Sequence, residues 1–192
     1  MKAMINKSRE AIEYTMEGAK AHLLIAGIIV LVSTIIIPFI WIYGYGNFRI
    51  GWGIFSKFFL VWLIGGIVIH ELLHGLTLAY FVRNRFKSIK FGIDWKNLSP
   101  YCHCKESLKV RNYKLGVAMP LIVMGIIPML TGFIIGNGAI FIIGIFFTWA
   151  ASGDIIILFM LRNLKNDDYV LDHPKKLGFI LHPIIDNPNP KV

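Results

Sequence analysis

Charged residues are scarce in this chain of 192 residues: only 16% are Asp, Glu, Lys or Arg. A typical soluble domain carries about a quarter. Hydrophobic residues make up 56% and the mean hydropathy is +0.63. Cysteine is almost absent, with Cys102 and Cys104 alone, which excludes a disulfide framework. This composition is typical of a membrane protein rather than of a soluble domain with a rich core.

The hydrophobic residues are concentrated in four long blocks, at residues 23–42, 54–82, 115–135 and 139–161. Each block reaches the ~20 residues needed to cross ~30 Å of hydrocarbon. The first is too long for the core of a signal peptide, so we expect it in the mature protein. We therefore predict an all-α membrane protein with about four transmembrane helices, forming a single membrane-embedded domain over residues 1–192.

Lysine and arginine cluster in three segments, at residues 1–21, 83–114 and 162–192, whereas Arg49 and Lys57 alone lie on the opposite side. By the positive-inside rule, both termini and the middle loop are cytoplasmic. The net charge of +9 then matches anionic lipid headgroups. We expect membrane lipids as partners and no nucleic acid, in an integral membrane protein.

The second block contains the sequence His70-Glu71-Leu72-Leu73-His74-Gly75. Residues four apart lie on one face of a helix, so His70 and His74 are able to bind one ion. Glu71 lies beside them, where a carboxylate accepts a proton from a metal-bound water. The motif predicts a catalytic zinc site, although iron or cobalt would accept the same ligands in vitro.

Asp154 is the one other acidic residue inside the hydrophobic blocks. His74 precedes the end of its block by about 12 Å and Asp154 by about 10 Å, at 1.5 Å per residue. This similar depth makes Asp154 the expected third ligand. Two alternatives stay open: Asp154 orients a ligand histidine without binding the metal, or the residues form a purely structural hydrogen-bonded cluster. Gly75, Ser152 and Gly153 are expected to let the second and fourth spans approach closely.

The middle loop has strand periodicity. Ile89, Phe91 and Ile93 alternate with polar residues, a turn follows at Lys96 and Asn97, and a second strand is expected near Tyr101. These residues predict a short cytoplasmic β-hairpin between the second and third spans. Its edge is a candidate substrate-binding surface for an extended peptide, formed by Ile89, Phe91, Ile93 and Tyr101; the alternative is a hairpin that only covers the bundle.

Other segments carry weaker patterns. The spacing of Cys102-His103-Cys104 is too tight to favour a second zinc site. Residues 8–20 predict either a surface helix or a loosely ordered tail. Residues 162–192 indicate a small cytoplasmic appendage. Pro120 and Pro128 are expected to kink the third span.

The chain resembles the putative zincin peptidases of bacterial membranes, distant relatives of the site-2 intramembrane metalloproteases. The resemblance is carried by residues 70–75, the basic loop with Tyr101, Pro120, and Ser152-Gly153-Asp154. It implies a zinc-dependent protease of the bacterial cell membrane, with His70, His74 and Asp154 as ligands and Glu71 catalytic. Site-2 proteases usually place a glycine after the third-ligand aspartate, whereas here Ile155 follows Asp154.

These observations favour hydrolysis of peptide bonds in a membrane protein or peptide substrate, with Zn²⁺ as cofactor. Two other hypotheses use the same residues: hydrolysis of a lipid amide or ester, and an ion relay in a metal-dependent transporter. A transporter has no need of a glutamate beside two histidine ligands, and no internal repeat supports two alternating halves.

The distribution of positive charge yields a topology prediction. Reporters fused after Asn97 and after Pro190 should both read cytoplasmic, and one in the turn at residues 136–138 should read external. An external signal after Asn97 would contradict both the four-span arrangement and the depth match between His74 and Asp154.

Overall fold

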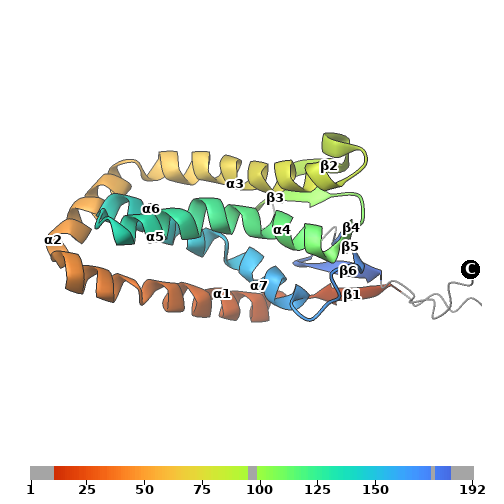
Figure 1. Ribbon diagram of the computed structural model, residues 1–192, viewed down its shortest axis with the longest axis horizontal. Coiled ribbons are helices and arrows are strands. Elements are labelled where there is room, and N and C mark those ends of the chain that lie inside the picture. The colour runs from red at the N-terminus through yellow and green to blue at the C-terminus, as the bar shows by residue number, and fades with distance from the viewer. Residues whose placement is uncertain (1–10, 95–98, 174–175, 183–192) are drawn as a thin grey trace, which may run out of the picture.

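The computed structural model describes residues 11–94, 99–173 and 176–182, a helical body with β-strands gathered at one end (Figure 1). The helices are α1 (Gly18–Ser33), α2 (Ile36–Lys57), α3 (Phe59–Phe81), α4 (Val110–Pro120), α5 (Ile127–Ile134), α6 (Gly138–Ala150) and α7 (Ser152–Leu161), with shorter helical segments η1 (Arg85–Ser88) and η2 (Leu121–Ile126). The strands are β1 (Ile12–Thr15), β2 (Ile89–Asp94), β3 (Ser99–Cys104), β4 (Leu108–Lys109), β5 (Tyr169–Asp172) and β6 (Gly178–His182).

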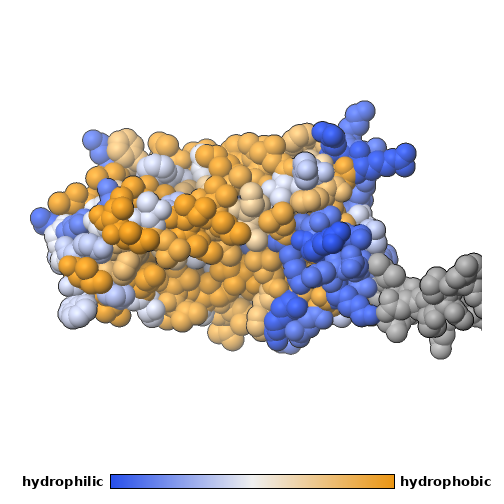
Figure 2. All heavy atoms as spheres, viewed as in Figure 1, coloured by the Kyte–Doolittle hydropathy of each residue, from blue (hydrophilic) through white to orange (hydrophobic). Residues whose placement is uncertain are grey.

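Two stretches are long and apolar enough to cross a membrane: α3 and the helix over Val110–Ile134. Two others are long and apolar enough only when a bent pair is taken together, α1 with α2 at 48° and α6 with α7 at 55°. The structure therefore has two to four candidate spans, and four crossings stay a prediction. Figure 2 shows apolar residues over the helical body and hydrophilic residues over the strand end, as expected for helices that face lipid.

The predicted span boundaries are wrong where the chain bends. The block at 54–82 begins inside α2, and α3 starts only after Phe58 leaves the helical conformation, at φ −108° and ψ 19°. The other two bends lie inside the blocks at 23–42 and 139–161. Hydropathy cannot reveal a bend that leaves the apolar content unchanged.

The third span runs as one helix through both of its prolines. Its middle part, η2, is a π-helix that begins directly after Pro120. A proline ring clashes with the carbonyl four residues earlier, and π-type hydrogen bonding is one way for a helix to continue past such a site. The helix thus continues past Pro120 through a local change of hydrogen bonding, and the expected kinks stay a prediction.

The all-α prediction misses part of the strand end, where two antiparallel sheets form. The predicted hairpin is confirmed as β2 and β3, paired from Ile89 with Cys104 to Asp94 with Ser99. Its expected turn at Lys96 and Asn97 lies outside the described residues. The second sheet has four strands in the order β1-β6-β5-β4, and the sequence analysis did not predict it.

Residues expected to form a surface helix or a tail contribute to this second sheet. Ile12 to Thr15 form β1, which pairs with β6, and α1 begins only at Gly18; residues 8–10 lie outside the described part. The predicted appendage supplies β5 and β6, in which Val170 and Phe179 are fully buried. A four-residue strand whose partner lies near the other end of the chain leaves no periodic signal to detect.

A buried cluster joins this sheet to the ends of the helices. It combines residues from α3, α4, α7, the hairpin and the four-stranded sheet: Leu78, Ala79, Val82, Ile89, Cys104, Leu108, Val110, Tyr113, Val117, Leu161, Val170, Phe179 and Leu181. A second cluster lies toward α2 and α6, where Phe39 stacks on Phe141 at 4.2 Å between ring centroids. The first cluster fixes the hairpin and the sheet relative to α3.

The expected role of Gly75 is corrected by its surroundings. A Cβ atom at Gly75 would collide with the ring of Phe91 on the hairpin, and one at Gly153 would meet only Leu177, at 3.9 Å. Gly75 therefore admits the hairpin against α3 rather than the fourth span. The close approach to the fourth span occurs at Gly66, which faces the ring of Phe147 on α6.

Candidate metal centre

The His-Glu-x-x-His motif lies on α3, and Asp154 lies in the first turn of α7. The bend at Ala151 makes α7 a separate helix inside an apolar segment, and a carboxylate in the first turn of a helix is favoured by the helix dipole. Across this bend, the Ser152 hydroxyl donates a hydrogen bond to the Trp149 carbonyl at 2.6 Å. The break in the fourth block thus places a carboxylate opposite α3.

The structure brings the three predicted ligands together. His70 Nε2 lies 3.2 Å from His74 Nε2 and 3.2 Å from Asp154 Oδ2. His74 Nε2 lies 3.3 Å from Asp154 Oδ1. Within the described ranges this is the one group of three such side chains whose ligand atoms all lie within 4.8 Å of one another. Neighbouring ligand atoms around a tetrahedral zinc with bonds of ~2.0–2.1 Å are about 3.3 Å apart, so the spacing fits zinc.

The ring of His74 is oriented by a hydrogen bond from α4. Its Nδ1 lies 2.9 Å from the carbonyl oxygen of Gly116. Because a carbonyl oxygen only accepts, Nδ1 carries the proton and donates it. In the neutral ring, the lone pair of Nε2 then faces His70 and Asp154. Such a bond commonly fixes the tautomer of a metal-binding histidine.

Pro120 explains why the Gly116 carbonyl is available. In an α-helix this oxygen would accept the N–H of the residue four positions later, and proline has no N–H to donate. A Cβ atom at Gly116 would also collide with Leu78 of α3, so the glycine lets the two helices approach. The sequence analysis missed this pair, although a proline four residues after a glycine inside an apolar helix was visible.

The surroundings of Asp154 favour a metal centre over a purely structural cluster. Its side chain is 14% exposed, and among the described residues Oδ2 has no hydrogen-bond partner. The 3.2 Å approach of His70 Nε2 to this oxygen does not have hydrogen-bond geometry. A self-sufficient polar cluster would satisfy its buried oxygens, whereas a cation would complete this one.

The centre opens into a large cavity. The cavity has a volume of about 1120 Å³ and is lined by residues of α1, α3, α6, α7, the hairpin and the β5–β6 region. His70, Glu71, His74 and Asp154 all line it. Glu71 is therefore placed beside the proposed ligands with access to a molecule in the cavity.

The hairpin contributes only part of the expected substrate surface. Ile93 and Tyr101 line the cavity. Ile89 is buried in the cluster between helices and sheet, and Phe91 lies over Gly75. Alternation along the strand identified β2 correctly, but it could not tell which of its apolar residues face α3 and which reach the cavity.

Cys102-His103-Cys104 is not a second metal group. Cys104 is buried and donates from Sγ to the Glu106 carbonyl at 3.4 Å, and burial raises the pKa of both thiols. His103 Nδ1 instead lies 3.1 Å from Asp172 Oδ2. The sequence analysis did not predict this His103–Asp172 pair, because Asp172 comes from β5.

Two histidines, a glutamate and an aspartate line one cavity, in a helical body with two to four candidate membrane spans. This is the residue set that zinc metallohydrolases use. The chain belongs to the putative zincin peptidase family, which matches residues 63–169, more than half of its length. The match confirms the predicted zincin peptidase family, whose description suggests a zinc metallopeptidase; the relation to site-2 proteases stays a prediction. No curated protein and no solved structure matches the chain.

The geometry predicts that Asp154→Ala loses both metal and activity, because one of three protein ligands is removed. Asp154→Asn should retain part of the metal, since an amide oxygen is a weaker, neutral donor. Zinc content of the purified proteins measures this, with the exposed Asp167→Ala as control. Near-normal zinc in Asp154→Ala, with affinity or rate lowered by roughly 10–100-fold, would instead assign Asp154 the role of orienting a ligand.

The Gly116 carbonyl predicts an effect at a distance from the ligands. Pro120→Ala restores an N–H that competes with His74 for this oxygen, so zinc affinity should fall, by up to about 10–100-fold. Pro128→Ala, in the same span, is the matched control and should leave zinc affinity unchanged. Competition with a chelator measures the zinc affinity of both variants. An equal loss of affinity in the two would show that removal of either proline from this helix has the same general effect.

Proposed function

We propose that the chain is a zinc-dependent membrane metallopeptidase that hydrolyses peptide bonds of membrane-associated substrates. The observation that carries the proposal is the contact of His70, His74 and Asp154 next to Glu71, at the wall of a cavity. Membership of the putative zincin peptidase family supports the same reaction.

Each residue of the centre has a distinct role in this proposal. His70, His74 and Asp154 hold the ion, and the Gly116 carbonyl orients His74. Zinc, when bound, supplies a Lewis acid that makes a water more acidic and polarises a carbonyl group. Glu71 accepts a proton from the attacking water and delivers it to the amine nitrogen as the peptide C–N bond breaks.

The hairpin is the proposed platform for the substrate. A peptide must be extended at the centre, because a helix hides its peptide bonds in its own hydrogen bonding. In the described part of the chain, β2 and β3 pair only with each other, which leaves strand edges for a peptide to join. Ile93 and Tyr101 are the hairpin residues placed to contact it in the cavity.

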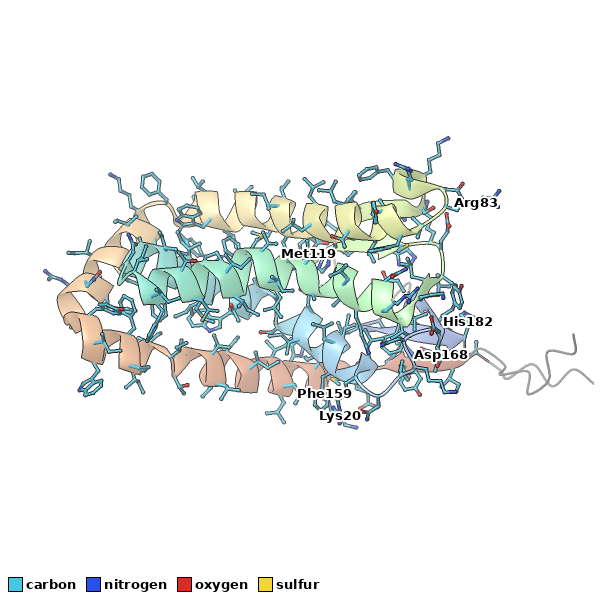
Figure 3. The ribbon with its side chains drawn as sticks, viewed as in Figure 1. Lys20, Arg83, Met119, Phe159, Asp168 and His182 are labelled. Carbon is cyan, nitrogen blue, oxygen red and sulfur yellow. The ribbon has the colours of Figure 1, made fainter. Side chains whose placement is uncertain are left out.

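We also propose that the helical body is embedded in the membrane with the strand end at the cytoplasmic face. Figure 3 shows Arg83, Asp168 and His182 at the strand end and Met119 within the helical body. Lys and Arg residues near the strands would meet anionic headgroups, and the cavity would be reached from that side.

Replacement of Glu71 tests the function directly. Glu71→Gln keeps the size of the side chain and loses its basicity, so hydrolysis should be abolished while zinc content stays near wild type. The assay uses detergent-solubilised, zinc-loaded protein and a quenched-fluorescent library of apolar peptides. Glu17→Gln, on an exposed side chain, is the control and should retain activity.

Two results would contradict this assignment. A loss of zinc in Glu71→Gln as large as in His70→Ala would make Glu71 a ligand. Hydrolysis that persists in Glu71→Gln at the wild-type rate would exclude Glu71 as the general base.

A further inference from the structure

The cavity contains a second polar group that the proposed chemistry has not yet used. His103 on β3 and Asp172 on β5 both line it, together with the residues of the metal centre. Their side chains are 21% and 17% exposed. A histidine and a carboxylate at the wall of a hydrolytic cavity are candidates for a role in the reaction.

The pair holds the His103 ring in one orientation. His103 Nδ1 lies 3.1 Å from Asp172 Oδ2, and the Tyr113 hydroxyl donates to Asp172 Oδ1 at 2.9 Å. Both carboxylate oxygens therefore have a hydrogen-bond partner, and Asp172 Oδ2 accepts a hydrogen bond from His103 Nδ1–H. Nε2 is the nitrogen left for a molecule in the cavity.

The hairpin places this pair on the side of the cavity that α3 lines. β3, which carries His103, packs against α3, which carries Glu71. Phe91, the partner of Cys102 in the hairpin, lies over Gly75 of the same helix. His103, Asp172 and Glu71 therefore line one cavity between the hairpin and α3.

None of the residues assigned a role above is a hydrogen-bond donor for the negative charge that develops on the substrate carbonyl oxygen. Preorganised donors aimed at such a charge typically contribute about 10²–10³-fold to kcat. Among the described residues that line the cavity, His103 has its ring held through Nδ1 by Asp172. The imidazolium form, with the Asp172 carboxylate beside it, is the form that donates from Nε2 as well.

We propose that His103 is a catalytic residue of this site, which donates a hydrogen bond from Nε2–H to the carbonyl oxygen of the scissile peptide bond, and that Asp172 positions it. The inference rests on the proposed peptidase function. It goes beyond the family match, which ends at residue 169, before Asp172.

The step balances in protons and electrons. The oxygen of water adds to the carbonyl carbon while Glu71 takes a proton, and the C=O electron pair moves onto the carbonyl oxygen. That oxygen accepts the hydrogen bond from His103. When the C–N bond breaks, the pair re-forms C=O, and the amine nitrogen takes the proton from Glu71.

The test uses two probes on zinc-loaded, full-length protein. A phosphonamidate dipeptide has a tetrahedral anionic group in place of the reacting carbonyl, whereas acetohydroxamate binds the metal alone. For His103→Gln we expect kcat to fall by about 10²–10³-fold, with KM nearly unchanged. Phosphonamidate affinity should fall by a similar factor, and acetohydroxamate affinity should stay at the wild-type value.

Two further variants make the test specific. Asp172→Asn retains the bond from Tyr113 and should lower kcat and phosphonamidate affinity less than His103→Gln, with KM unchanged. It also keeps the proposal testable if His103→Gln does not fold. His182→Gln, on the exposed end of β6, is the control and should leave the affinity for both probes unchanged.

The outcomes separate this inference from the function on which it rests. If the wild-type protein hydrolyses peptides, and His103→Gln and Asp172→Asn keep its kcat and its phosphonamidate affinity, the role of His103 is overturned and the peptidase proposal stands. An equal fall in the affinity for phosphonamidate and for acetohydroxamate in these variants would also overturn the role of His103, because it would show damage to the metal centre. A wild-type protein that neither binds zinc nor cleaves any peptide would overturn the peptidase proposal, and this inference with it.

Discussion

A carboxylate inside an apolar helical body is the constraint on which the arrangement depends. Asp154 is expensive to bury unless a positive charge or hydrogen-bond donors meet it. Its carboxylate lies against Nε2 of His70 and of His74, where a cation held by all three residues would supply that charge. This requirement ties α7 to α3. The bend before α7 puts Asp154 in the first turn of a helix, where the helix dipole favours a carboxylate.

The third span packs against α3 and holds His74 in position for this contact. A glycine allows α4 to approach α3, and the proline one turn later leaves the glycine carbonyl to His74. Pro120, which removes one helix hydrogen bond, thus leaves a backbone acceptor for His74 in a region where apolar side chains offer none. The hairpin also packs on α3, since Phe91 fills the space over Gly75.

The residues of the centre were predictable because their signals are local or periodic. His70, Glu71 and His74 form a motif within one helix turn, and the depth of Asp154 follows from counting residues along an apolar block. The alternation at Ile89, Phe91 and Ile93 likewise identified β2. The β1–β6 pairing, the bend at Ala151 and the contact of Asp172 with His103 depend on segments far apart in the chain. No pattern within one segment encodes such contacts.

The pairing of β1 with β6 sets an order of assembly. Ile12–Thr15 are synthesised early, whereas their partner strand is Gly178–His182. β1 therefore cannot pair until nearly all of the described residues have been synthesised. Contacts of such long sequence separation form late. Asp172 lies on β5, the neighbour of β6, so its part of the cavity wall also forms late. In the proposed membrane peptidase, the helices would therefore enter the bilayer before this part of the cavity wall is in place.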